Sequence, residues 1–243
     1  MATSLKLSLD SGTVLEDGSD YRTLVGRLLY LANTRPDISF VVQQLSQFIQ
    51  NPTDLHLRAA HRVLQYIKAA PGRGLFFPAD SIVKLNAFSD FDWASCIDTR
   101  RSITGFCGFL DQALITWRSK KQATVSTSSS EAEYRTLATT TCELQWLSFL
   151  LRDFGLPLTS PASLYCDSQS ARHIAANPTF HERTKHLDID CHIVRERLQT
   201  GLIHLLPIKT QDQLADIFTK PLAPSPFLTL LSKLGMIDIH SPT

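Results

Sequence analysis

A change of residue pattern at positions 70–74 (Ala-Pro-Gly-Arg-Gly) most constrains the fold of this 243-residue chain. Proline and glycine in close succession interrupt both helices and strands. Before this cluster, apolar residues recur with the spacing of helices, and after it short strand-like runs alternate with helical stretches. We therefore predict a flexible lead-in (1–19), a small helical segment (20–74), an α/β domain (81–222) and a C-terminal helix and tail (223–243).

Three helices are predicted in the first part of the chain. The first has Asp20 as its N-cap and ends before Pro36, because proline disfavours helix in the residue that precedes it. The second runs from Pro36 to about Gln50, and the third begins at Thr53 or Asp54.

The second part predicts a mixed sheet covered by helices. Ser130 and Glu133 match the S-x-x-E capping box of a long helix. The predicted fold class is therefore mixed α/β, with a five-stranded mixed sheet flanked by helices and preceded by the small helical segment. Strands are expected at 82–90, 103–110, 113–118, 163–167 and 202–208, and helices at about 130–154, 168–176, 186–199, 212–220 and 226–235.

Four acids lie at the edges of these predicted elements: Asp90, Glu133, Asp167 and Asp216. Acids in this order on alternating strands and helices can meet at one end of a single sheet. Their carboxylate oxygens are hard ligands of the kind that Mg²⁺ prefers. The arrangement predicts a metal-dependent nuclease. Taken singly, Asp167 could instead be a helix N-cap, and Asp216 a capping or exposed residue.

Charge and cysteine content limit the other classes of site. The 24 Lys and Arg residues balance 23 Asp and Glu to a net charge of +1, so any nucleic-acid surface must be local. Arg58 and Arg62 on the third predicted helix offer such a surface, although a solvated helix face has the same pattern. The cysteines form no C-x-x-C pair and, with the histidines at 181–192, match no zinc spacing. No apolar run is long enough for a membrane span or signal peptide, so we expect an intracellular protein without a membrane partner.

Six stretches of the second part carry a family resemblance. They are Ser-Asp-Phe-Asp-Trp-Ala at 89–94, Arg-Arg-Ser-Ile-Thr-Gly-Phe at 100–106, Ser-Ser-Glu-Ala-Glu-Tyr at 129–134, Cys-Asp-Ser-Gln-Ser-Ala at 166–171, Arg-Thr-Lys-His-Leu-Asp-Ile at 183–189 and Gln-Leu-Ala-Asp-Ile-Phe-Thr-Lys-Pro-Leu at 213–222. In this order they resemble the ribonuclease H domain of reverse transcriptases from copia-type (Ty1/copia) LTR retrotransposons. Residues 21–77 resemble the segment that joins the polymerase to this domain. An adjacent Asp-Asp pair marks the polymerase site of this family, and the chain has no such pair. It is identified as a C-terminal part of a Pol polyprotein.

The resemblance implies hydrolysis of the RNA strand of an RNA–DNA hybrid with two Mg²⁺ ions, for which Mn²⁺ can substitute. It implies that the four acids are both the catalytic and the metal-binding residues, on a ribonuclease H-like fold. Its expected partners are the hybrid and the reverse-transcriptase and integrase parts of the polyprotein, in cytoplasmic virus-like particles or the nucleus; the oligomeric state stays open. Residues expected to contact the hybrid are Ser129, Ser130, Ser168, Gln169, Arg118, Lys120, Lys121, Arg58 and Arg62.

Two of the acids have a close competitor. Glu131 and Glu133, two residues apart on a helix, point about 200° apart, so at most one faces the metals. Glu133 is preferred because Glu-Tyr resembles the start of the family's helix, and Glu131 suits the helix N-terminus. Asp90 is preferred over Asp92 because Phe-Ser-Asp at 88–90 resembles the family's strand end.

Three functions fit these observations. The first is an active ribonuclease H, and the second is a catalytically inactive or polymerase-dependent hybrid-binding remnant. The third is another nuclease on the same sheet, such as a resolvase or transposase, against which the motifs at 166–171 and 213–222 speak. The loop at 208–211 lacks the histidine that cellular ribonucleases H carry there.

Overall fold

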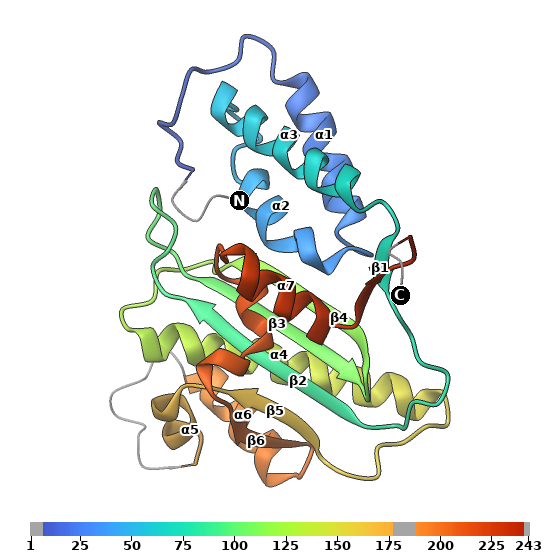
Figure 1. Cartoon of the computed structure of the whole chain (residues 1–243). Helices are drawn as coiled ribbons and strands as arrows, with labels where there is room; N and C mark the ends of the chain where they lie inside the picture. The colour runs from blue at the N-terminus through green and yellow to red at the C-terminus, as the bar shows by residue number, and fades with distance from the viewer. Residues whose placement is uncertain (1–6, 177–187, 241–243) are drawn as a thin grey trace.

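A helical segment and a β-sheet form two adjoining parts of the molecule (Figure 1). The structure, a computed structural model, describes residues 7–176 and 188–240. Figure 1 shows α1 to α3 together beyond the β4 edge of the sheet, with α4 across one face of the sheet and α7 across the other. Within the described residues, no helix is long and apolar enough to cross a membrane.

The helical segment contains α1 (Ser19–Leu31), the 3₁₀ helix η1 (Pro36–Ile38), α2 (Ser39–Ser46) and α3 (Asp54–Ala69). The predicted first N-cap is wrong: Gly18 caps α1, and Asp20 lies in the first turn, where a carboxylate interacts favourably with the helix dipole. The second helix begins as a 3₁₀ turn and ends at Ser46, before the predicted Gln50. The predicted start of the third is confirmed, because the Thr53 side chain accepts a hydrogen bond from the amide of α3 three residues on.

A polar hub joins the helices to the linker that follows them. It consists of the buried residues Arg35 and Asp37 and the partly buried residues Tyr66 and Arg73. Arg35 donates to both carboxylate oxygens of Asp37, at 2.9 and 2.7 Å, and the Tyr66 hydroxyl donates to the same carboxylate at 2.7 Å. Arg73 donates to the Tyr66 hydroxyl at 2.9 Å. Both charges of the Arg35–Asp37 pair are buried, and each is neutralised by the other.

Five strands form the sheet: β2 (Leu85–Asp92), β3 (Ile103–Leu110), β4 (Ala113–Lys121), β5 (Ala162–Cys166) and β6 (Ile203–Pro207). Their order is β4-β3-β2-β5-β6. β3 is antiparallel to β2 and β4, whereas β2, β5 and β6 are mutually parallel. The predicted five-stranded mixed α/β fold is therefore confirmed. β2 continues to Asp92 and β4 to Lys121, both beyond their predicted ends.

Helices cover both faces of this sheet. α4 (Ser129–Asp153), α5 (Gln169–Ala176) and α6 (Asp188–Gln199) lie on one face, and α7 (Pro224–Lys233) with the 3₁₀ helix η5 (Leu214–Phe218) lies on the other. The predicted Ser130–Glu133 capping box is wrong, because the extended residue Ser128 is the N-cap and accepts the amide of Glu131.

Two other predicted helices differ from the structure. The helix expected over 212–220 is two 3₁₀ turns, η4 (Thr210–Asp212) and η5, since Gln213 between them is extended. The beginning of the helix expected over 186–199 lies outside the described residues, and α6 is described from Asp188.

A second, two-stranded sheet was absent from the predicted elements. β1 (Arg73–Leu75) pairs antiparallel with β7 (Met236–Asp238) and holds the end of the described chain against the linker. In the lead-in, Val14 forms an isolated β-bridge with Thr53. The predicted boundaries of the four segments stay predictions.

Candidate active site

Neighbouring parallel strands place Asp90 and Asp167 at one end of the sheet. Phe88 of β2 pairs with Tyr165 of β5, so Asp90 and Asp167, two residues further on, follow at the same carboxyl end. Asp90 is 2% exposed. Asp167 is half-buried and accepts a hydrogen bond from the Thr210 hydroxyl at 3.3 Å. The loop before the last predicted acid thus presents a hydroxyl, where cellular ribonucleases H present a histidine.

Asp92 shares a strand face with Asp90. β2 stays paired with β3 through Asp92, so the alternation of side chains puts both acids on the same side. Asp92 lies at the strand end and is partly exposed, whereas Asp90 is buried. Burial therefore distinguishes the two competitors where strand alternation does not.

Glu133 extends from α4 toward the same end of the sheet. Its side chain is buried, and the Cys166 thiol donates to its Oε1 atom at 2.9 Å. Its Oε2 atom is also buried and has no hydrogen-bond partner among the described residues. Glu131 instead stabilises the start of the helix. Its carboxylate accepts a hydrogen bond from the Thr127 amide at 2.7 Å and forms an ion pair with Arg135 at 2.7 Å.

A close approach of η5 to the sheet brings Asp216 to the same place. Gln213, just before η5, donates to the Ser89 carbonyl at 3.0 Å and fixes this turn to β2. On the neighbouring strand, a Cβ atom at Gly105 would lie only 2.5 Å from the Thr219 side chain. The packing that positions Asp216 therefore requires a residue without a side chain on β3.

Lys220 connects the Asp90 and Asp216 carboxylates. Its Nζ atom lies 2.7 Å from Asp216 Oδ1 and 3.1 Å from Asp90 Oδ2. The Thr219 hydroxyl also donates to Asp90. The sequence analysis missed Lys220 and Thr219, although the four-residue spacing from Asp216 to Lys220 is typical of ion pairs within one helical turn.

Burial raises the pKa of two of these acids. It raises the pKa of Asp90 from 3.8 to about 7, an increase that Lys220 opposes and Asp216 reinforces. It raises the pKa of Glu133 from 4.5 to about 8, and the charges of Asp90 and Asp167 add to the increase. These mutual effects mean that the four acids share one electrostatic environment, which is typical of functional sites.

The donor atoms of this site fit a divalent cation, but their present arrangement does not enclose one. Among the described residues, no group of three or more acids, histidines or cysteines could hold a metal ion as it stands. The Lys220 ammonium bridges two of the acids. The donors are nevertheless hard carboxylate oxygens, and the unpaired Oε2 of Glu133 is available as a ligand. The acids therefore fit Mg²⁺ or Mn²⁺ once the ammonium moves.

The predicted polar contacts to the hybrid lie at the starts of α4 and α5. Ser129 and Gln169 are exposed. The Ser130 hydroxyl lies 3.3 Å from that of a serine in α5, so the two helix starts meet. Ser168 accepts a backbone amide of α5 at 3.2 Å, which gives the capping role to Ser168 and leaves Asp167 out of it.

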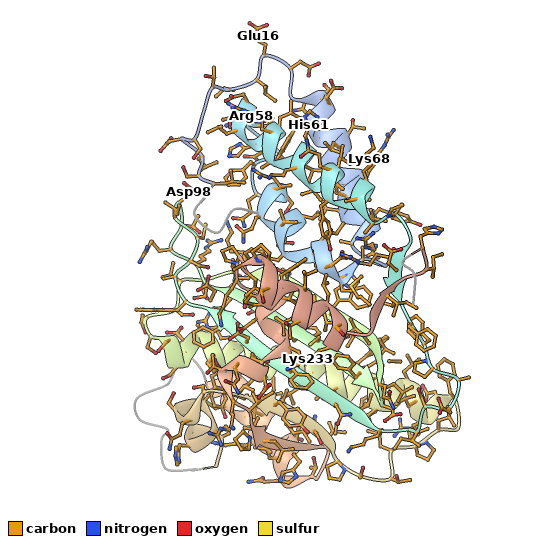
Figure 2. All side chains as sticks on the ribbon, viewed as in Figure 1. Glu16, Arg58, His61, Lys68, Asp98 and Lys233 are labelled. Carbon is orange, nitrogen blue, oxygen red and sulfur yellow. The ribbon has the colours of Figure 1, made fainter. Side chains whose placement is uncertain are left out.

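The predicted basic contacts divide between two places. Lys120 and Lys121 end the edge strand β4 and pair with the first residues of β3, which in turn pair with the last residues of β2. Arg118 precedes them and is exposed. Arg58 pairs with an acid of its own helix and lies on the outer side of α3 in Figure 2. Arg62 is exposed and lines a groove of about 480 Å³ between α3 and α7, which reaches the lysine that bridges the acids.

Comparisons with known proteins agree with the predicted resemblance. No family model matches the chain. The retrovirus-related Pol polyprotein of transposon RE1 from Arabidopsis thaliana is 47% identical over 239 residues, which cover 98% of this chain and 16% of that protein. The Pol polyprotein of transposon TNT 1-94 from Nicotiana tabacum is 35% identical over 243 residues, which cover 97% of this chain and 18% of that protein. The chain thus spans less than a fifth of the length of these curated relatives.

Solved structures are more distant. An N-terminal RNase H domain from Mycobacterium tuberculosis matches 62% of this chain and 97% of its own, with a TM-score of 0.39 and 11% identity. A foamy viral protease-reverse transcriptase, solved in complex with dsDNA, matches 84% of this chain and 40% of its own, with a TM-score of 0.43 and 13% identity. The five-stranded mixed sheet flanked by helices is the architecture that was predicted for a ribonuclease H-like fold. Sequence identity over nearly its whole length shows that the chain belongs to the retrovirus-related Pol polyproteins of copia-type retrotransposons.

Proposed function

We propose that this chain hydrolyses the RNA strand of RNA–DNA hybrids, as the ribonuclease H part of its polyprotein. The observation that carries the proposal is the approach of Asp90, Glu133, Asp167 and Asp216 to one end of the sheet from four separate elements. Membership of the Pol polyproteins supports the same conclusion.

Each acid has a distinct place in the proposed reaction. Two divalent cations, when bound, would activate the attacking water and stabilise the leaving oxygen. Asp90, whose charge acts on Glu133 and which lies in the field of Asp216, would be the shared ligand. The Cys166 thiol holds one oxygen of Glu133 and leaves the other open, and a threonine hydroxyl orients Asp167.

Recognition of the RNA strand would come from polar groups beside the acids. The 2′-hydroxyl is the group that lets a protein distinguish RNA from DNA at the cut strand. The lysines at the end of β4 suit phosphate contacts, which carry no sequence preference. The side chains available for the 2′-hydroxyl are those at the starts of α4 and α5: Ser129, Ser130, Ser168 and Gln169.

Cleavage of a hybrid by the whole chain of residues 1–243 tests this proposal, with label on either strand, in Mg²⁺, in Mn²⁺ and in EDTA. Asp167→Asn should abolish cleavage because it removes one carboxylate from the set of four, while the fold survives. Asp212→Asn is the matched control, since Asp212 is half-exposed and pairs with Lys233 at 3.1 Å. Equal cleavage by Asp167→Asn, or cleavage in EDTA, contradicts the proposal.

A second candidate is a catalytically inactive or polymerase-dependent hybrid-binding module. The ammonium that bridges Asp90 and Asp216 favours it. This candidate predicts hybrid binding that weakens with salt, but no cleavage by the folded protein in either metal. Hybrid binding at two salt concentrations, measured beside the cleavage assay, separates the two functions.

A further inference from the structure

Of the four acids of the candidate site, two are paired with a cation within the described residues. Within the described residues, Lys220 is the only cation paired with Asp90 or Asp216. Glu133 accepts a hydrogen bond from a thiol, and Asp167 accepts one from a hydroxyl. Neither acid has an ion pair with another described residue. Lys220 therefore offsets one of the two negative charges of Asp90 and Asp216, and no cation of the described residues pairs with Glu133 or Asp167.

The turn that places Asp216 also fixes the position of Lys220. The Lys220 backbone amide donates to the Asp216 carbonyl at 3.0 Å, so both residues belong to one turn at the end of η5. The lysine side chain is 33% exposed, whereas that of Asp90 is 3% exposed. The ammonium thus reaches a buried carboxylate from the solvent side.

An ammonium and a divalent cation cannot share these oxygens. Mg²⁺ binds carboxylate oxygens at about 2.0–2.1 Å and tolerates little distortion. The Lys220 ammonium lies within 2.7 and 3.1 Å of one oxygen from each acid. Charges of +1 and +2 about 4 Å apart at a partly buried site repel each other strongly. Binding of a metal between Asp90 and Asp216 therefore requires the ammonium to leave.

The groove between α3 and α7 gives the displaced side chain room. Lys220 lines this groove of about 480 Å³ together with Tyr66, Leu222 and Phe227. A lysine has a flexible four-carbon stem that packs against apolar surface while its ammonium stays in water. The side chain can therefore withdraw along the groove without unfolding the turn.

We propose that Lys220 is a built-in counter-cation, which holds Asp90 and Asp216 together in the metal-free protein and must be displaced when a divalent cation binds there. The inference rests on the proposed function and adds to it that a positioning residue of the chain itself sets the metal affinity. Its consequence is competition: the charge that stabilises the metal-free site weakens metal binding.

Lys220→Met tests this competition because methionine keeps the apolar stem and removes the charge. In EDTA the variant should unfold at a lower temperature, and its Kd for Mn²⁺, measured by calorimetric titration, should be lower than that of the wild type by about tenfold or more. Lys233→Met, which removes an exposed pair with Asp212, should change neither quantity appreciably. A folded Lys220→Met protein with unchanged or weaker Mn²⁺ affinity overturns the inference.

A measurement on the wild-type chain decides the question even where the variant does not fold. Reductive methylation followed by mass spectrometry gives the reactivity of Lys220 relative to Lys233. Mn²⁺ should increase this ratio several-fold, because the displaced ammonium loses its carboxylate partners. A ratio that stays constant or falls overturns the inference.

The cleavage assay keeps this inference separate from the proposed function. Cleavage by the wild type together with unchanged Mn²⁺ affinity in Lys220→Met refutes the role of the lysine alone. Tighter Mn²⁺ binding by the variant without cleavage by the wild type refutes the proposed function and leaves the competition standing. Failure of both proteins to bind Mn²⁺ overturns the inference.

Discussion

The polar hub and the acidic end of the sheet are both largely buried clusters of charged groups, but they differ in how far their charges are paired. In the hub, Arg35 and Asp37 neutralise each other, and Asp37 accepts three hydrogen bonds. At the acidic end, within the described residues, one ammonium pairs with two of the four carboxyl groups, and Glu133 Oε2 lacks a hydrogen-bond partner. Burial of charge stabilises a fold only when the charges are paired. The imbalance at the acidic end is therefore a mark of function, and loss of the negative charge of Asp37 or of Glu133 should change stability with opposite sign.

Glu133→Gln should have the largest effect and break the acidic end. Hybrid cleavage should fall about 10³-fold or more, because an amide cannot replace an anionic ligand. The free energy of unfolding in EDTA at pH 7 should rise by roughly 1–3 kcal/mol, because burial disfavours the ionised form of the glutamate that is removed. Cleavage assays and urea unfolding measure the two effects.

Glu131→Gln is the matched control for that change. It weakens the pair with Arg135 and the hydrogen bond from the Thr127 amide, so stability should fall by about 1 kcal/mol while cleavage persists. Loss of cleavage in Glu131→Gln but not in Glu133→Gln would show that Glu131, and not Glu133, is the metal ligand on the helix.

Asp37→Ala breaks the hub and should have the next largest effect. It leaves Arg35 buried without its carboxylate partner, so the free energy of unfolding should fall by about 3–5 kcal/mol. Urea unfolding of Asp212→Ala, which removes an exposed ion pair, should show a loss of about 1 kcal/mol or less. Equal losses in the two variants would mean that the hub contributes no more than a surface pair.

Gly105→Ala tests how the acidic end is assembled. The new methyl group would meet the Thr219 side chain at 2.5 Å and the Phe218 backbone at 3.2 Å, so η5 must shift. We expect a loss of about 1–3 kcal/mol by urea unfolding and weaker cleavage, because η5 carries Asp216. Gly26→Ala in α1 meets no atom within 4 Å and should instead stabilise the protein by about 0.5–1 kcal/mol. Unchanged cleavage in Gly105→Ala would show that Asp216 does not depend on this packing.

The interiors of the elements were predictable from the sequence because local patterns determine them. The strand at 103–110 has the predicted bounds, since a continuous run of buried residues lies between polar breakers. The capping box was misplaced because both Ser128–Glu131 and Ser130–Glu133 fit the motif, and only the extended backbone at Ser128 decides between them. The pairing of β1 with β7 joins two three-residue runs, which are too short to show any alternation.

Some residues of the candidate site could likewise be predicted from the sequence, and others could not. The acids follow from the motifs and from the ends of strands, so their approach to one another could be predicted. The groups that control them could not, because Lys220, Cys166 and Thr210 reach the acids through tertiary contacts. Of these, only Lys220 has a local sequence signal, its spacing from Asp216.

A change of pH sharpens the comparison between the two clusters. The pKa of Glu133 is raised from 4.5 to about 8, chiefly by burial, so between these values the folded chain holds a proton that the unfolded chain has lost. The contribution of this group to stability therefore falls by up to about 1.4 kcal/mol per pH unit as pH rises from about 5 to 8. Above pH 8 this contribution is constant. In the hub, burial and then Asp37 raise the pKa of Tyr66 from 10.0 to about 12, so its own loss of stability begins only above about pH 10.

Urea unfolding in EDTA at pH 6, 7 and 8 isolates the Glu133 contribution as the difference between wild type and Glu133→Gln. Wild type should lose stability relative to Glu133→Gln as pH rises over this range. The same loss should be measured when both proteins also carry Asp37→Asn, because the hub does not contact Glu133. Mn²⁺ should reduce or reverse the slope, since a bound cation favours the ionised carboxylate that burial disfavours. A difference that is independent of pH would mean that Glu133 has access to water, and the contrast between a paired and an unpaired buried cluster would then lose its physical basis.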